Sequence, residues 1–511
     1  MNSVQTSPAP AALAVPQSGL GWLAPSLCDL FFLAVIGWSF MTAGTGWGRL
    51  LWDGDTALHM AIGNYVLDHH TVPTSDPFSF TEPNAPWLAS EYGTGVVFAA
   101  LNRSFGLKGV VFVCGVTIAA LITVLLRSML AAGADIFLSI MLALMASNAL
   151  SLHYHARPHL FTLLFLAVTA WAISTDRVQN RGSIWLLVPL AALWANLHPG
   201  FVILLAYLVL VVLGCALEWW TGVGSRSAVV RYAALAGACG LATLVNPFGI
   251  GLHFEVLSYL RAHEMTDFLQ EFQAPTFRST PQLYYMAFLL AGLAVAGVLV
   301  SRKKFTDALP IFALGYASLI SLRHSTVFVI IAAPIIAREL SIVWQRWVTH
   351  QPKTSSARIL DDLSRQRSAS LSRTSVWAVA GLAAVFLWSP ASSWPAGFDG
   401  DNFPVDMAAR HAELATSRVF TTEQWADYLL YRNYPWQRNF YDDRSLYGAK
   451  MFRPVAALLD GKPGWNDFLD KYNTELVLIE SKSTLSKLLS ESAAWTLVDR
   501  DKTAALFRRV R

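Results

Sequence analysis

Long apolar runs alternate with short polar connections over residues 28–391 of the chain. A helix needs about 20 mostly apolar residues to cross a bilayer, so each run of roughly that length is a candidate span. The pattern therefore predicts a mainly α-helical, polytopic membrane bundle of about eleven spans. The expected spans are 28–48, 107–126, 135–152, 159–175, 184–198, 200–217, 230–246, 282–300, 307–321, 325–343 and 375–391. Residues 1–27 lack Lys and Arg and are expected to form a disordered cytoplasmic segment rather than a signal peptide.

Residues 392–511 follow a different pattern, in which short apolar stretches alternate with charged ones. This pattern predicts a small C-terminal α/β domain. The expected strands are 418–422, 439–443, 475–480, 495–501 and 505–510, and the expected helices are 423–432, 446–460, 464–473 and 483–492. The domain has no GxGxxG, GxxxxGK[ST] or CxxC motif, so the sequence assigns no cofactor to it.

The composition agrees with a membrane protein. The chain is 54% hydrophobic and 14% charged, whereas an average soluble protein is about 25% charged. The net charge of +4 is small, and we expect membrane lipids rather than nucleic acid as partners. The four cysteines lie in or beside apolar runs, which argues against a disulfide framework or a cysteine zinc site.

The distribution of Lys and Arg predicts the orientation, because cytoplasmic connections carry the excess of positive charge. The connection between the last two expected spans is the richest in these residues, which are Arg346, Lys353, Arg358, Arg365, Arg367 and Arg373. With this connection inside, the N-terminus is cytoplasmic and the C-terminal domain is extracytoplasmic, as expected for a bacterial inner or plasma membrane protein. The same orientation places most histidines at the outer face.

The first outer loop, 49–106, is too long to be a simple connection. Residues 56–70 have helical spacing and predict an amphipathic helix on the outer membrane interface. A second helix, about 89–104, carries Glu91. The loop 247–281 is expected to be partly helical and contains Glu255, Glu264, Asp267 and Glu271.

The sequence Asp53-Gly54-Asp55, followed by His59, directly follows the first span. A carboxylate with restricted hydration is expected to have a raised pKa and can act as a general base toward a hydroxyl group. Asp53 and Asp55 could also share a divalent cation, since hard cations prefer carboxylate oxygens. Alternatively, one of the two aspartates caps the following helix.

Four further positions at the outer face could carry chemistry. In the segment 153–159, Arg157 could bind a phosphate beside His155 and His159. Alternatively, the histidines could bind zinc, for which imidazoles are suitable ligands. A third interpretation is that Tyr, His and Arg side chains anchor the segment in the headgroup zone of the membrane. His198 ends a span. It could contribute to the site, or its role could be limited to hydrogen bonds between helices. Arg323 and His324 occupy a tight outer turn, where an arginine needs an anion or water. Glu91 could orient His59 or be a solvated surface group.

Together these residues suggest sugar transfer from a lipid-phosphate donor. Such a reaction needs a base for the acceptor hydroxyl and cations for the departing phosphate. The candidate catalytic residues are Asp55, Asp53, His59 and Glu91. The candidate donor-phosphate-binding residues are Arg157, Arg323, His155, His159, His198 and His324. No cofactor is certain, and a divalent metal ion, if used, is assigned to Asp53 and Asp55.

The run from Asp53 to Gly93 resembles the first external loop of bacterial GT-C superfamily glycosyltransferases, in a poorly characterised branch. The segments WANLHPG, LVNPFG and NFYDDRSLYG are also similar to that branch. The resemblance implies a polyprenyl-phosphate-linked sugar as donor, a glycan, lipid or protein as acceptor, and a catalytic acid just after the first span. That acid maps onto Asp55 or Asp53, and Asp55 pairs better with His59 at i, i+4. The acidic pair is Asp-Gly-Asp rather than the Asp-Glu of protein O-mannosyltransferases and aminoarabinose transferases, so the acceptor and the metal requirement stay open.

Two other functions are compatible with a polytopic chain. A transporter or lipid-carrier flippase would place its substrate site near the bilayer midplane, often between repeated halves. Here the polar residues lie at the surface, and the sequence has no evident internal repeat. A non-catalytic assembly protein would use the α/β domain as its working part.

Overall fold

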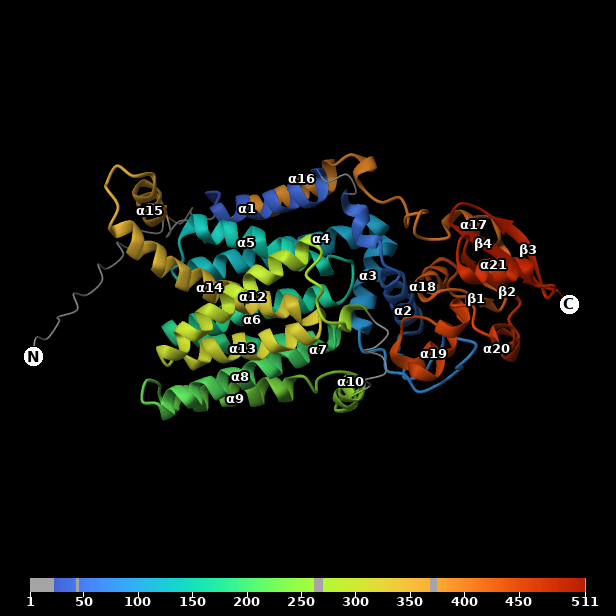
Figure 1. Ribbon diagram of the computed structural model, residues 1–511, viewed down its shortest axis with the longest axis horizontal. Coiled ribbons are helices and arrows are strands. Elements are labelled where there is room, and N and C mark those ends of the chain that lie inside the picture. Colours follow the sequence, from blue (N-terminus) through green and yellow to red (C-terminus); the bar gives the residue numbers. More distant parts are fainter. Residues whose placement is uncertain (1–22, 43–45, 262–269, 368–374, 511) are drawn as a thin grey trace, which may run out of the picture.

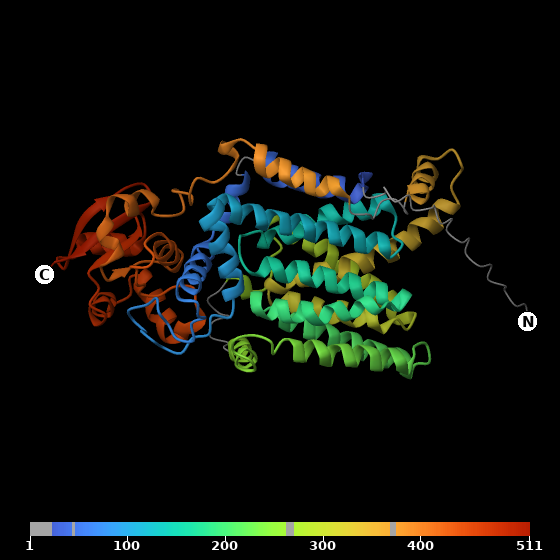
Figure 2. The same ribbon diagram turned by 180° about the vertical axis from the view of Figure 1, so that it is seen from behind.

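The computed structural model describes residues 23–42, 46–261, 270–367 and 375–510. A helical bundle occupies one part of the molecule, and a smaller region with a β-sheet lies at one end of it (Figure 1). Both views place α15 (Ser356–Arg367) at the opposite end of the bundle from the sheet (Figure 2).

The described bundle contains six helices that are long and apolar enough to cross a membrane. They are α4 (Leu107–Ala131), α5 (Ile136–Leu150) with the short helix η4 (Ser151–His153), α6 (His159–Gln179), α8 (Phe201–Trp220), α12 (Thr280–Ser301) and α14 (Arg323–Thr349). Shorter helices fill the other expected spans, namely α1 (Leu27–Ile36) with η2 (Gly37–Thr42), η5 (Gly182–Leu186) with α7 (Leu187–Leu197), α9 (Arg226–Ala242), α13 (Phe305–Ile320) and α16 (Val376–Trp388). Each expected span therefore contains a helix, and the exact number of crossings stays a prediction.

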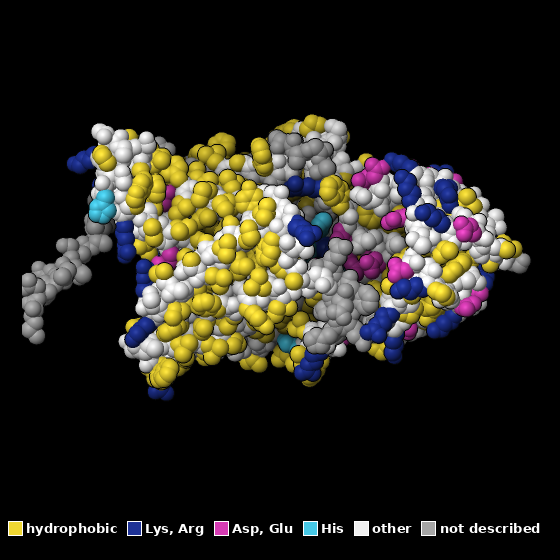
Figure 3. Space-filling model, in the orientation of Figure 1, with side chains coloured by type: hydrophobic (Ala, Val, Ile, Leu, Met, Phe, Trp, Pro, Cys, Tyr) yellow, Lys and Arg dark blue, Asp and Glu magenta, His cyan; other side chains and the backbone are white. Residues whose placement is uncertain are grey.

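The bundle has an interior and an apolar exterior. In α4 and α14, 72% of the apolar window is buried, against 39–50% in the other four long helices, so these two helices form the centre. Leu213, Leu290 and Phe312 are exposed on the outer helices, and hydrophobic side chains cover most of the bundle face in Figure 3. Helices satisfy their own backbone hydrogen bonds, which allows such a surface to face lipid. The chain is an integral membrane protein.

The first loop forms a helical layer at the end of the bundle, as the sequence predicts. It contains η3 (Gly46–Leu51), α2 (Asp55–His69) and α3 (Tyr92–Phe105). The helices α2 and α3 are in close contact, because a Cβ atom on Gly63 would lie 1.9 Å from the Gly95 carbonyl oxygen. Residues Thr56–Gly63 are buried. Protein therefore covers both faces of this half of α2, and the expected position of the helix at the outer membrane interface stays a prediction.

The C-terminal region combines helices with one four-stranded sheet in the order β1-β2-β4-β3. The strands are β1 (Val419–Phe420), β2 (Leu476–Glu480), β3 (Trp495–Arg500) and β4 (Ala504–Arg509). β1 and β2 are parallel, and the other neighbours are antiparallel. The helices are α17 (Val405–Arg410), α18 (Glu423–Arg432), α19 (Gly448–Leu459), α20 (Trp465–Lys471) and α21 (Thr484–Glu491). The α/β prediction is confirmed.

One predicted strand, 439–443, is wrong. Asn439 makes only isolated bridges, to Ser79 and Val419. The chain then turns, because the Asp442 side chain pairs with Arg444 inside the protein. This turn also connects the C-terminal region to the first loop, since Asn439 N donates to the Phe78 carbonyl at 2.8 Å and Phe80 N donates to the Asn439 carbonyl at 3.0 Å.

Candidate active site

A cavity of about 810 Å³ lies where the bundle, the first loop and the C-terminal region meet. Asp and Glu side chains gather at this junction (Figure 3). All ten residues that the sequence analysis selected line this one cavity, and they are Asp53, Asp55, His59, Glu91, His155, Arg157, His159, His198, Arg323 and His324. Their placement is a finding, and their roles stay predictions.

Arg157 is held between the two aspartates of the first loop. Its Nε atom lies 2.8 Å from Asp55 Oδ2, and its Nη2 atom forms an ion pair with Asp53. The backbone fixes this arrangement, because Ala156 N donates to the Leu50 carbonyl at 2.9 Å and Thr56 Oγ1 donates to the Ala156 carbonyl at 2.8 Å. Asp53 Oδ1 also accepts from Asp55 N at 3.0 Å, at the start of α2. Asp53 thus stabilises the helix start and pairs with Arg157.

The electrostatics of Asp55 differ from the expectation. Burial alone would raise the pKa of Asp55, but the neighbouring Arg157 guanidinium and a hydrogen bond from Asp443 hold that pKa below its ordinary value. The expected rise in the pKa of Asp55 is therefore wrong, because the sequence does not reveal how close Arg157 lies to Asp55. Asp55 is ionised at neutral pH and keeps the capacity to accept a proton.

Glu91 bridges two histidines. Its Oε2 atom lies 3.3 Å from His59 Nε2, and its Oε1 atom lies 3.2 Å from His198 Nε2. Because His198 Nδ1 accepts from Gly200 N at 2.9 Å, the other ring nitrogen is the one that donates to Glu91. Burial and the Asp55 carboxylate raise the pKa of Glu91 to about 8, and burial lowers the pKa of His59 to about 4. At neutral pH both side chains are therefore uncharged.

The other predicted residues surround these two groups. His159 Nε2 lies 2.7 Å from the His153 carbonyl oxygen, so this contact fixes the His159 ring. Burial lowers the pKa of His155, which lines the cavity with an unpaired Nδ1 atom. Arg323 Nη1 lies 3.2 Å from Glu271 Oε1, and 35% of its side chain is exposed. His324 follows it at the start of α14. Glu264 and Asp267, expected to enrich this side in acids, lie outside the described residues.

The C-terminal region also contributes to the cavity, which was not predicted from the sequence. Glu423, Gln424 and Asp443 also line the cavity, and Gly54 N donates to Gln424 Oε1 at 2.5 Å. Asp427 follows Glu423 by one helical turn on α18 and is fully buried. A signal was present in the sequence, because Asp427 is flanked by Trp425, Leu429 and Leu430, which form a buried apolar face.

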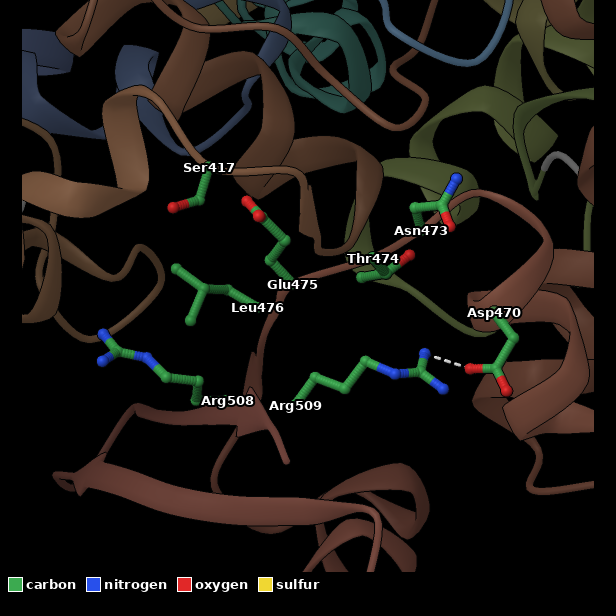
Figure 4. Close-up of a pocket in the computed structure, with 8 residues that line it drawn as sticks. All are labelled: Ser417, Asp470, Asn473, Thr474, Glu475, Leu476, Arg508 and Arg509. Atoms are coloured by element: carbon green, nitrogen blue, oxygen red, sulfur yellow. Dashed lines mark ion pairs between the residues drawn. The ribbon is translucent and has the colours of Figure 1, made fainter. Parts of the chain in front are cut away.

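A second cavity, of about 700 Å³, lies within the C-terminal region (Figure 4). Its charged side chains are largely paired with neighbours: Arg509 forms an ion pair with Asp470, and Arg508 Nη2 lies 3.1 Å from Glu413 Oε1. The candidate catalytic and phosphate-binding residues therefore lie at the first cavity, which we call the junction cavity.

Comparison with known proteins shows the fold. No family model and no curated protein matches the chain. Among solved structures, the archaeal oligosaccharyltransferase AglB from Archaeoglobus fulgidus, in complex with an inhibitory peptide and a dolichol-phosphate, aligns over 95% of this chain and 74% of its own at a TM-score of 0.60 and 10% identity. An Archaeoglobus fulgidus oligosaccharyltransferase tethered with an acceptor peptide aligns over 89% and 68% at a TM-score of 0.56 and 10% identity. The chain therefore has the polytopic fold of GT-C membrane glycosyltransferases, and the resemblance seen in the sequence is confirmed for the fold.

Proposed function

We propose that this chain is a membrane glycosyltransferase that moves a sugar from a polyprenyl-phosphate donor to an acceptor at the outer face of the membrane. The observation that carries the proposal is that Asp55, Arg157 and Arg323 line one cavity at the end of an apolar bundle. Glycosyl transfer needs a group that accepts the hydroxyl proton and cations that stabilise the departing phosphate. The junction cavity offers both within one space.

Asp55 is the proposed base, because Arg157 keeps its carboxylate ionised and in place. Asp53 holds the other side of Arg157. Arg323 is the proposed main contact of the donor phosphate, since it is partly exposed and, among the described residues, forms an ion pair only with Glu271. Arg157 would add a second positive charge. The residues proposed to shape the phosphate side of the cavity are His155, His159, His198 and His324.

The lining of the cavity suits an amphipathic donor. The cavity wall also includes apolar side chains, namely Ile203, Val256, Leu322 and Val327. A polyprenyl chain could follow such a wall while its phosphate reaches the arginine. The similar fold of AglB supports this donor class, since that protein was solved with a dolichol-phosphate.

A multi-span transporter or lipid-carrier flippase is the alternative. Transporters place polar binding groups near the middle of the membrane, whereas the junction cavity lies at one end of the bundle, against the C-terminal region. Movement of a lipid-linked sugar across sealed vesicles without any transfer to an acceptor would favour the alternative.

The direct test uses membranes that contain the protein. These membranes are incubated with labelled polyprenyl-phosphate sugars and scored for label in glycan, lipid and protein fractions, with and without a chelator. Transfer that depends on the protein supports the proposal. Release of no sugar from any donor, with the protein folded and inserted, would contradict it.

We further propose that the N-terminus is cytoplasmic and that residues 392–511 form an extracytoplasmic domain of a bacterial inner membrane protein. The support is the Lys- and Arg-rich connection that contains α15, which lies at the end of the bundle opposite the sheet (Figure 1). We expect a membrane-impermeant thiol reagent to label Thr484→Cys but not Thr354→Cys in intact cells with a permeable outer envelope.

The chain suits this labelling experiment. Thr484 and Thr354 are both exposed, so equal reactivity is expected once the membrane is dissolved. All four native cysteines are buried, which keeps the background low. Labelling of Thr354→Cys alone in intact cells would reverse the proposed orientation.

A pH dependence of donor binding is expected from Glu91. The charged and titratable groups near Glu91 are Asp55, His59, Arg157, His198, Glu271 and Arg323. Below its pKa of about 8, Glu91 is neutral, and above that value it adds a negative charge near the donor phosphate. We therefore expect the KM for the donor to rise about tenfold between pH 7 and pH 9.

Glu91→Gln provides the matched control, because the amide has the same shape and no charge. Its donor KM should stay at the low value across this pH range. A wild-type KM that does not change with pH, or the same rise in Glu91→Gln, would exclude Glu91 as its cause.

A further inference from the structure

Asp427 on α18 is a buried carboxyl group without a partner. Its side chain has 0% exposure, and neither carboxylate oxygen accepts a hydrogen bond from any described residue. An unpaired buried polar group costs free energy, so such groups in folded proteins usually serve a ligand, a water molecule or a chemical role.

Asp427 faces two further carboxyl groups that come from distant parts of the chain. One oxygen each of Asp55, Asp427 and Asp443 lies within 4.8 Å of the others. Asp55 begins α2, Asp427 lies on α18, and Asp443 lies in the turn before the short helix η9 (Ser445–Tyr447). The packing of the C-terminal region against the start of α2 thus brings the three together.

The nearby arginines pair with carboxylates other than Asp427. Arg157 pairs with Asp53 and Asp55, and its Nη2 atom is 3.9 Å from Asp443. Arg444 pairs with Asp76 and Asp442. Neither guanidinium forms an ion pair with Asp427, so these arginines leave the Asp427 carboxyl group without a counter-ion.

We propose that Asp55, Asp427 and Asp443 bind one divalent metal ion, such as Mg²⁺ or Mn²⁺, and that the C-terminal region supplies two of the three ligands. Hard divalent cations prefer carboxylate oxygens. Oxygens bound to one ion are at most about 4.2 Å apart for Mg²⁺ and about 4.8 Å apart for Ca²⁺. The three carboxylate oxygens, which lie within 4.8 Å of one another, would therefore move only slightly closer to bind one ion.

The position of this site explains how the ion would be used. Asp55 and Asp443 line the junction cavity, so the ion's remaining coordination positions would face the space where the donor phosphate is proposed to bind. This use rests on the proposed function, whereas metal binding itself does not. Asp53 is not among the three carboxyl groups that lie close together, and its oxygens contact Arg157 and the Asp55 backbone N–H instead.

The test is a titration of the purified full chain with Mn²⁺, followed by electron paramagnetic resonance. One bound Mn²⁺ is expected, and Asp427→Asn and Asp443→Asn should each weaken binding by about 100-fold or more. Asp467→Asn on the exposed surface of α20 is the matched control and should bind normally. Thermal unfolding without metal should confirm that the variants fold.

The outcomes separate the two proposals. Absence of Mn²⁺ binding by the wild type, or unchanged binding by Asp427→Asn, would overturn the metal site even if sugar transfer is observed. Mn²⁺ binding that needs Asp427 would support the site even if no polyprenyl-phosphate sugar is used.

Discussion

Asp55→Asn is expected to reduce sugar transfer by about 10²–10⁴-fold, the usual contribution of a positioned general base. The asparagine keeps the size of the side chain and removes the group that accepts the hydroxyl proton. Arg157 retains its ion pair with Asp53, so the local fold should remain. The measurement is the initial rate of label transfer in membranes, normalised to the amount of inserted protein.

Asp68→Asn is a suitable control for this variant, because Asp68 lies on the same helix, is exposed and forms a surface ion pair with Arg103. It should retain near wild-type transfer, since exposed ion pairs contribute little. An Asp55→Asn protein with full activity would refute the assignment of the base. Measuring Mn²⁺ binding by the same variant shows whether the loss also includes the metal ion.

The sequence predicts the architecture well because membrane helices and amphipathic helices have strong local patterns. The apolar runs locate the helices of the bundle, and α2 and α3 lie close to their predicted ranges. The strand predicted at 439–443 is wrong for a non-local reason. Its local composition favours a strand, but the buried pairing of Asp442 with Arg444 turns the chain away from the sheet.

The candidate site could be predicted only in part. The residues of the first loop and the outer turns stand out because charged groups beside apolar spans are costly. The pairing of Arg157 with both aspartates depends on a contact between segments about 100 positions apart, so the lowered pKa of Asp55 could not be foreseen. Asp427 and Asp443 were missed for the same reason, since only the packing of the C-terminal region against the first loop brings them close to Asp55.

Arg444→Met is expected to destabilise the protein by about 3–5 kcal/mol, because it leaves two buried carboxylates without a counter-ion. Arg444 Nη1 lies 2.6 Å from Asp76 Oδ1, and Nε lies 2.7 Å from Asp442 Oδ1. Both carboxylate side chains have 0% exposure, and the guanidinium also lies 4.7 Å from the centre of the Trp87 ring. Chemical unfolding in detergent, followed by tryptophan fluorescence, measures the change.

The reason for this large effect is that the Arg444 ion pairs join the C-terminal region to the first loop. The triple variant Arg444→Met, Asp76→Asn, Asp442→Asn should recover part of the lost stability, because it removes the unpaired charges. Arg438→Met, an exposed arginine in the same segment, should change stability by less than about 0.5 kcal/mol. If Arg444→Met unfolds at the same denaturant concentration as Arg438→Met, the buried ion pairs do not hold the two parts together. The C-terminal carboxylates would then need another anchor to stay at the junction cavity.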